Sequence, residues 1–222
     1  MSIRASEGMD SIELALRRDT HAGHGRGPAE VRRVGSESAA AQAARRLAAR
    51  MAAEGLSDVS YATVDSPFGT LLAAATARGL VRLAFPEEDI DSVLERLARR
   101  VSPRIVQAPV PLDPVRRELE EYFAGRRRAF AVKLDWTLVG PFARRVLAVT
   151  SEIPYGGVLS YAEVAADAGS PRGSRAAGNA LGSNPMPIVV PCHRVLRSGG
   201  ALGGYGGGVE RKRWLLELEG AL

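Results

Sequence analysis

The sequence predicts an α/β protein: a small N-terminal α/β domain followed by a mostly helical C-terminal domain with a winged helix-turn-helix. Three observations predict it. Short apolar runs bounded by turn residues occupy residues 61–85. Helical apolar spacing is present in residues 87–123. Two short helical stretches separated by a tight turn lie within residues 160–181. We therefore divide the chain into an extension of residues 1–58, an α/β domain of residues 59–138 and a helical domain of residues 139–222.

The extension differs in character from the rest of the chain. Residues 23–28 are rich in glycine and break helices, whereas residues 36–54, rich in Ala and Arg, predict a helix. Its apolar stripe consists of Ala40, Ala43, Ala44, Leu47 and Met51. Because this stripe is mostly alanine, the helix would bury little area and would depend on docking. His21 and His24 have a spacing that a metal could use, but without further ligands we expect no metal site.

The α/β domain alternates strand and helix signals. The predicted elements are strands at residues 61–64, 70–76, 80–85 and 105–107, and helices at residues 87–100 and 114–123. Gly125 is expected to stop the second helix. The domain contains no candidate catalytic constellation. Residues 126–128, three arginines, are interpreted as a solvated loop, with direct DNA contact as the alternative.

The helical domain opens with Pro141 in a first helical turn. The expected buried face of that helix comprises Phe142, Val146, Val149 and Ile153. Ser160 and Glu163 have the spacing of a capping box, so a short helix should begin there and end at Gly169. A second helix is expected from Ser170 to Leu181.

This second helix is made almost entirely of small residues around Arg175. Each interior glycine lowers helix stability by about 1 kcal/mol, so something should compensate. Taken alone, the helix leaves two explanations open: close approach to a DNA groove, or a tight helix–helix contact. The nearby Cys192 favours approach to DNA.

Composition is that of an ordinary globular chain, with 45% hydrophobic and 25% charged residues. The net charge of +5 suits a polyanionic partner, although a charge of this size is weak support by itself. A single cysteine excludes an internal disulfide and a multi-cysteine zinc site. No apolar run approaches the length of a membrane span, and no signal-peptide pattern opens the chain, so we expect a cytoplasmic protein.

Cys192 is the only cysteine, and His193 comes directly after it in Pro-Cys-His-Arg-Val. An ionised thiol is a strong nucleophile, and an adjacent base favours its ionisation. The ordinary alternative is a buried cysteine that packs as a small hydrophobe. The surrounding residues decide between these two interpretations.

Residues 184–195, Asn-Pro-Met-Pro-Ile-Val-Val-Pro-Cys-His-Arg-Val, resemble the active-site signature of the O6-alkylguanine-DNA alkyltransferases, also called methylated-DNA–protein-cysteine methyltransferases. The resemblance continues through Gly-Gly-Tyr-Gly-Gly-Gly at residues 203–208 and Trp-Leu-Leu-Glu-Leu-Glu-Gly at residues 214–220. It extends from about Tyr61 to the C-terminus and does not include the extension.

The resemblance implies repair by irreversible transfer of an alkyl group from guanine O6 in DNA, and from thymine O4, to the sulfur of Cys192. It implies that His193 ionises the thiol through a bound water, and that Glu219 orients His193. It makes Asn184 the brace of the turn that holds the nucleophile. It makes Tyr161 the proton donor to the departing guanine.

Binding residues are implied in the same way. The substrate pocket is expected at Val195, Tyr205, Gly206 and Gly207. DNA binding is expected at Tyr161, Arg175, Ala176, Ala177, Gly178 and Arg194. Arg175 would fill the space left by an extruded base. The expected partner is double-stranded DNA containing O6-alkylguanine, bound by a monomer without cofactor or metal; cooperation between molecules along DNA is left open.

One departure from the family concerns the pocket: animal members carry a serine at the position of Gly206, so selectivity for bulky adducts is left open. Two other functions compete. An alkyltransferase-like protein would recognise alkylated DNA without chemistry, but such relatives usually replace the cysteine. A cysteine hydrolase would use Cys192 and His193, but its nucleophile and base are usually far apart in sequence.

Overall fold

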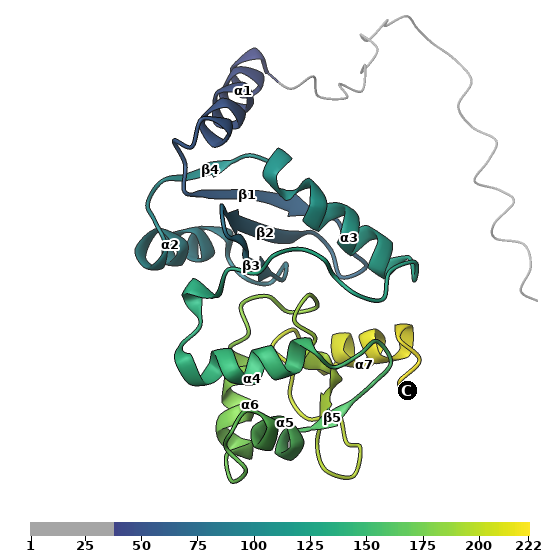
Figure 1. Cartoon of the computed structure of the whole chain (residues 1–222). Helices are drawn as coiled ribbons and strands as arrows, with labels where there is room; N and C mark the ends of the chain where they lie inside the picture. Colours follow the sequence, from purple (N-terminus) through teal and green to yellow (C-terminus); the bar gives the residue numbers. More distant parts are fainter. Residues whose placement is uncertain (1–37) are drawn as a thin grey trace, which may run out of the picture. The chain divides into compact units, whose positions relative to one another are not determined.

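The computed structural model describes residues 38–222, so His21, His24 and the glycine-rich residues 23–28 lie outside the described part of the chain. It has the predicted class, a small sheet-containing part followed by a mostly helical part (Figure 1). The elements of the first part are α1 (Ala39–Ala53), β1 (Val59–Val64), β2 (Leu71–Thr76), β3 (Gly79–Ala84), α2 (Ile90–Arg100), β4 (Ile105–Gln107), η1 (Val110–Leu112), α3 (Asp113–Phe123) and η2 (Trp136–Leu138). Those of the second are α4 (Pro141–Ser151), β5 (Leu159–Ser160), α5 (Tyr161–Asp167), α6 (Ser174–Gly182), η3 (Cys192–Arg194), β6 (Val195–Leu196) and α7 (Val209–Leu218).

The main sheet has the strand order β3-β2-β1-β4. Its three longer strands pair antiparallel in sequence order, and β4 returns to pair parallel with β1. All four strands were predicted, because apolar runs of this length between turn residues have few alternatives. α2 begins at Ile90 rather than residue 87, since the side chain of Asp89 caps the helix by accepting a hydrogen bond from Ser92 N.

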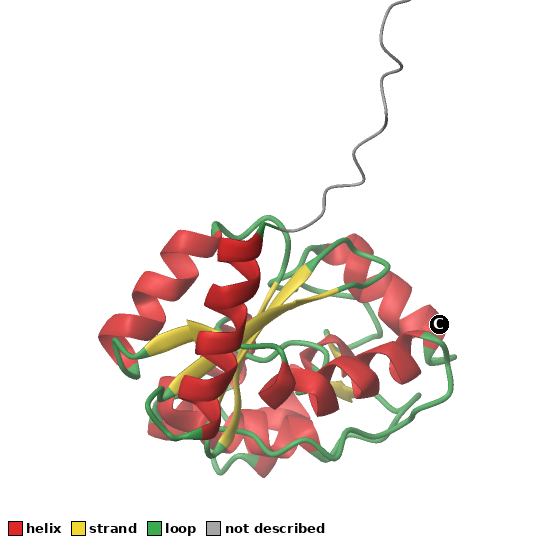
Figure 2. Ribbon diagram, turned by 90° about the horizontal axis from the view of Figure 1, so that it is seen from above, coloured by secondary structure: helices red, strands yellow, loops and turns green. Residues whose placement is uncertain are grey.

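Alternation along the strands gives the sheet two buried faces. Residues such as Val59 and Leu72 pack against Val93 and Leu97 of α2. The other face packs against α3 and forms one continuous core with the helical part. Figure 2 looks along this arrangement from above, with strands in yellow and helices in red.

The helix in the extension is present, but its predicted stripe is wrong. Leu47 is 61% exposed, and no residue of α1 is buried. The partly buried residues of α1 share only Met51 with the predicted stripe; they are Ala41, Ala48, Ala49, Met51 and Ala52. The helix contacts β4. Its small alanine surface has little burial to drive docking, as the composition suggested.

The helical part is built from α4, α5 and α6, which contact one another. The buried residues of α4 are Val146, Leu147 and Thr150, so Leu147 and Thr150 join the predicted face while Phe142 and Val149 are only partly buried. The predicted capping box is confirmed: Glu163 N donates to Ser160 Oγ and Ser160 N donates to the Glu163 carboxylate.

α6 is shorter than predicted. Gly173 N donates to Ser170 O at 2.8 Å, which closes a turn, and the helix starts only at Ser174. The turn between α5 and α6 therefore includes Arg172, and the two helices form the predicted helix-turn-helix. A two-stranded parallel pair, β5 with β6, joins the start of α5 to the segment after Cys192.

Candidate active site

Cys192 begins η3 at the end of an irregular, buried segment. Ile188 in this segment has a φ of 74°. No other non-glycine residue among residues 38–222 has a positive φ. A branched residue in this conformation costs of order 1–3 kcal/mol, so the surroundings must impose it. Ile188 is completely buried, and Val190 N donates to Met186 O at 2.9 Å across the turn.

Asn184 fixes this turn with three hydrogen bonds. Its Nδ2 donates to Val190 O at 2.9 Å and to Cys192 Sγ at 3.1 Å, while its Oδ1 accepts from Met186 N at 3.0 Å. The amide therefore contacts the sulfur and both arms of the turn. The sheet part adds a further restraint, because Leu83 N donates to Pro185 O at 2.8 Å.

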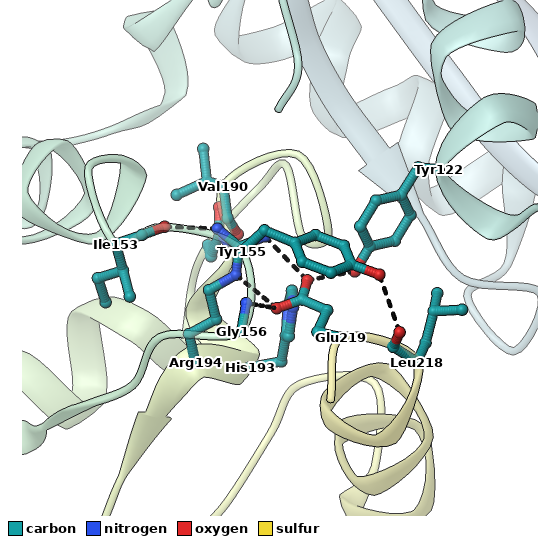
Figure 3. Close-up of polar contacts among 10 residues, drawn as sticks. Tyr122, Ile153, Tyr155, Gly156, Val190, His193, Arg194, Leu218 and Glu219 are labelled. Carbon is teal, nitrogen blue, oxygen red and sulfur yellow. Dashed lines mark hydrogen bonds and ion pairs between the residues drawn. The ribbon is translucent and has the colours of Figure 1, made fainter. Parts of the chain in front are cut away.

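His193 and Glu219 form a buried pair behind the nucleophile (Figure 3). Glu219 is the C-cap residue that follows α7, and its Oε1 lies 3.0 Å from His193 Nε2. The other ring nitrogen, Nδ1, is buried and has no protein hydrogen-bond partner. The hydrogen bond to Glu219 fixes the orientation of the His193 ring and leaves the lone pair on Nδ1, as in a hydrolase triad.

Arg194 is also part of this cluster, so its side chain binds the buried carboxylate here, and its contact with DNA stays a prediction. It is 5% exposed, and its guanidinium binds both carboxylate oxygens of Glu219 at 2.8 Å. It donates as well to Ile153 O. A buried carboxylate needs a charged partner, which explains why the arginine lies inside the protein.

Burial and these contacts shift the pKa values of Glu219, His193 and Cys192. Burial by itself would raise the pKa of Glu219, but the hydrogen bonds from His193 and Arg194 outweigh it and lower the pKa to about 2. Burial lowers the pKa of His193, against the opposite effect of Glu219, so the imidazole is neutral. Burial raises the pKa of Cys192 to about 11, although the Asn184 amide and the Lys212 charge act in the opposite direction.

The sulfur faces an open pocket of about 480 Å³. Six of the predicted site residues line it: Tyr161, Arg175, Gly178, Cys192, Tyr205 and Gly206. Figure 1 places the contributing segments, α5, α6 and the stretch before α7, in the helical part. A separate cavity of about 500 Å³ reaches Pro191 and Arg194, but Cys192 does not line it.

Five predicted binding residues do not line this pocket: Arg194, Val195, Gly207, Ala176 and Ala177. The side chains of Val195 and Ala177 are completely buried, so the contact that the resemblance implies for Val195 would have to come from its backbone, and both assignments stay predictions. Gly207 is also buried, and a Cβ there would lie 2.6 Å from the ring of Phe85. Close packing against that ring explains why a residue without a side chain stands here, and the approach of its backbone to a base stays a prediction. Ala176 is exposed on α6 but does not line the pocket.

The small residues of α6 leave space rather than make a tight helix contact. A Cβ added to Gly178 would lie 3.7 Å from the ring of Tyr161, an ordinary van der Waals distance. A Cβ on Gly182 would meet nothing within 4 Å. The helix–helix explanation therefore has no support at Gly178, and the other glycine of the predicted helix, Gly173, lies in the turn before α6, where a Cβ would clash with Ser170 Oγ.

Sequence reasoning missed two residues, Lys212 and Tyr122. Lys212 is completely buried in α7 and donates to Val195 O, and burial lowers its pKa to about 8. Its position between two arginines is typical of a solvated helix, so the pattern gave no signal. Tyr122 donates from α3 to Glu219 at 2.6 Å, although its sequence context is that of a packing residue.

Within residues 38–222, no helix is long and apolar enough to cross a membrane. The same residues hold no group of three or more His, Cys, Asp or Glu side chains placed to bind a metal ion. A thiol beneath an open pocket, backed by a neutral histidine and set beside a helix-turn-helix, defines a protein that uses a cysteine to modify DNA.

Comparisons with known proteins agree with this class. Residues 59–136 match the 6-O-methylguanine DNA methyltransferase ribonuclease-like domain, and residues 141–221 match the DNA binding domain of the same family. A methylated-DNA–protein-cysteine methyltransferase of Mycolicibacterium paratuberculosis is 41% identical over 162 residues, which is 72% of this chain and 92% of that protein. The constitutive enzyme of Bacillus subtilis is 37% identical, over 72% of this chain and 94% of that protein.

A solved structure of Mycobacterium tuberculosis OGT in complex with DNA superimposes with a TM-score of 0.62. It is 41% identical and covers 72% of this chain and 92% of its own. The chain belongs to the 6-O-methylguanine DNA methyltransferase family, which confirms the predicted enzyme class and its function in DNA repair.

Proposed function

We propose that this protein transfers the alkyl group of an O6-alkylguanine in duplex DNA to the sulfur of Cys192, once per molecule. The observation that carries the proposal is the position of the only thiol of the chain, which faces the pocket lined by Tyr161 and Arg175. The product is a thioether, which is a poor leaving group. The protein would therefore be consumed in the reaction.

The proposed reaction is an in-line displacement at the alkyl carbon, in which the S–C bond forms as the C–O6 bond breaks. The thiol proton passes through a water molecule to Nδ1 of His193. This assignment is supported by the hydrogen bonds of the ring: with the ring proton on Nε2 and donated to Glu219, the lone pair on Nδ1 is the basic site. The lowered pKa of His193 keeps that lone pair available at neutral pH.

The departing guanine leaves with the electron pair of the broken bond and needs a proton. We assign this proton to the hydroxyl of Tyr161. Burial and the nearby Cys192 raise the pKa of Tyr161, so it carries its proton at neutral pH. It lines the pocket and donates to Gly204 O at 3.2 Å, an acceptor that it can exchange for substrate.

The reacting base must leave the helix stack to reach the sulfur, so we propose that the target nucleotide is flipped into the pocket. The volume of about 480 Å³ is within the range of small-molecule sites. The exposed Arg175 on α6 would fill the gap left in the duplex. We propose further that a monomer acts in the cytoplasm, where a reducing environment keeps the thiol free.

Mass spectrometry tests the acceptor. After incubation with duplex DNA containing O6-methylguanine, the intact protein should gain the mass of one methylene, and a proteolytic fragment should place it on Cys192. The matched control is Cys192→Ala, which removes the only thiol and should leave the DNA lesion unrepaired. Titration against excess lesion should end at one equivalent.

Two results would contradict the proposal. Turnover beyond one equivalent would show a catalyst that releases its alkyl group. Binding to alkylated duplex with an unmodified Cys192 would indicate recognition without chemistry. Varying the protein concentration in the same titration tests cooperation between molecules, which a monomer acting alone would not show.

A further inference from the structure

Tyr122 connects the sheet-containing part of the chain to the buried carboxylate (Figure 3). It lies on α3, it is completely buried, and its hydroxyl donates to Glu219 Oε1 at 2.6 Å. The same oxygen lies 3.0 Å from His193 Nε2 and accepts from Arg194 at 2.8 Å. Tyr122 and His193 thus share one acceptor atom.

The phenol is held in place and stays protonated. Its ring packs against Phe123, Phe130 and Tyr155, with centroid distances of 5.6, 5.2 and 6.2 Å. Burial, reinforced by the Glu219 carboxylate, raises the pKa of Tyr122, so the hydroxyl remains a neutral donor throughout the physiological range. An ordered aromatic cluster of this kind gives the donor little freedom to turn away.

We propose that Tyr122 is a positioning residue that sets the basicity of His193 through Glu219. The inference rests on the proposed role of His193 as the base. A carboxylate oxygen that accepts a short, strong hydrogen bond from Tyr122 has less electron density to offer the imidazole. The proton affinity of the base is therefore controlled from a helix that contributes no residue to the reaction pocket.

The groups around His193 and Glu219 determine whether removal of the Tyr122 hydroxyl raises or lowers the pKa of His193. Arg194 and Lys212 both oppose protonation of His193, and Glu219 favours it. Removing the hydroxyl of Tyr122 strengthens the hold of Glu219 on a protonated His193 and also makes Glu219 itself easier to protonate. The first change moves the fall in rate at low pH to higher pH, because His193 must be neutral to accept the thiol proton; the pKa of Glu219, about 2, lies too low for the second change to matter there.

The test is the pH profile of single-turnover alkylation of Cys192 in Tyr122→Phe, measured on full-length protein. The fall in the alkylation rate at low pH, the acid limb of the profile, should move to higher pH by about one pH unit. This corresponds to a rate about tenfold lower at a given pH on that limb, while the rate near neutral pH changes little. The matched control is Tyr155→Phe. Its hydroxyl donates to Leu218 O at 2.8 Å, next to the carboxylate, but not to Glu219. Its acid limb should coincide with that of the wild type.

A direct titration of the His193 imidazole by NMR gives a second readout that needs no substrate. Its pKa should be higher in Tyr122→Phe than in the wild type, and thermal unfolding checks that both proteins are folded. An acid limb and an imidazole pKa identical to the wild type would overturn the inference. So would a rate that falls equally at every pH, since that is the result of a merely structural role.

Failure of the proposed function gives a different result. If the wild type itself does not alkylate Cys192, the role of His193 as base has no basis, whatever Tyr122→Phe does. If the wild type alkylates Cys192 and only the pH shift is absent, the proposed function stands and the role of Tyr122 falls.

Discussion

Arg175→Ala separates the handling of DNA from the chemistry at sulfur. Arg175 is exposed on α6 and lines the pocket that Cys192 faces. Removing an exposed side chain should change the free energy of unfolding by less than about 0.5 kcal/mol. The hydrogen bonds of Asn184 and Glu219 do not include Arg175, so the thiol and its base remain as they are.

The magnitude is set by base extrusion. Taking a paired base out of the stack costs a few kcal/mol, and a guanidinium inserted in its place recovers part of that. If Arg175 recovers about 1.4–2.8 kcal/mol, its loss slows repair of duplex DNA about 10- to 100-fold. Free O6-benzylguanine needs no extrusion, so its reaction with Cys192 should stay close to the wild-type rate.

The matched control is Arg172→Ala. Arg172 lies in the turn before α6, is exposed, and does not line the pocket, yet its loss removes the same charge. A purely electrostatic contribution to DNA binding would slow both variants equally and would vanish at high salt. Insertion into the duplex would slow only Arg175→Ala.

The assay is single-turnover alkylation of Cys192 by O6-methylguanine duplex, by the same lesion in single-stranded DNA, and by the free base. An equal fall in all three reactions of Arg175→Ala would show a structural residue and refute the insertion argument. If the rates of Arg172→Ala and Arg175→Ala fell equally, and only with duplex DNA, Arg175 would contribute to DNA binding through its charge and not by insertion.

Three further predictions concern groups outside the duplex contact. Glu219→Gln removes a carboxylate whose pKa is lowered from 4.5 to about 2. Such a group stabilises the wild type by a few kcal/mol above pH 4.5, and part of this is lost as the pH falls toward the lowered pKa. The difference from the variant in urea unfolding should therefore shrink on acidification, and a constant difference would contradict the lowered pKa. Lys212→Met removes a charge that favours the Cys192 thiolate, so alkylation at neutral pH should slow. The variant also leaves Val195 O without its hydrogen-bond donor, which should lower the free energy of unfolding by about 1–3 kcal/mol. An unchanged alkylation rate would show that the charge of Lys212 does not affect the thiol. A protein that begins at Asp58 should alkylate Cys192 at a rate close to that of the full chain, because α1 contains no buried residue; loss of activity in a folded truncated protein would place α1 in the scaffold.

The elements of the fold could be predicted where periodicity and end signals agreed. The strands and the capping box at Ser160 are of this kind. The start of α6 could not, because Ser170 forms a turn that only the hydrogen bond from Gly173 reveals. The stripe of α1 also failed, since a surface made mostly of alanine has no strongly preferred buried side and docking against β4 decides it.

The sequence predicted the site residues that lie in the matched segments, but not the buried partners that hold them in place. Cys192, His193 and Glu219 lie in matched segments, so their proximity could be expected from the sequence. The ion pair of Arg194 with Glu219 was not predicted, because a sequence does not show that a carboxylate buried far along the chain requires a cation. The burial of Glu219 creates that requirement, and only the folded structure shows how it is met.

The sheet-containing part has no residue in the pocket, yet it restrains the active site at two points. Leu83 N binds Pro185 O, next to the asparagine that holds the sulfur, and the Arg82 guanidinium contacts the same carbonyl at 3.4 Å. Tyr122 binds the carboxylate behind the base. One restraint acts on the nucleophile and the other on the proton acceptor, so their relative position depends on both parts of the chain. The sheet-containing part is therefore expected to affect the reaction without touching a reacting atom. Loosening the contact at Pro185 should displace the nucleophile and slow alkylation, whereas loss of the Tyr122 hydroxyl should change the rate only on the acid side of the pH profile.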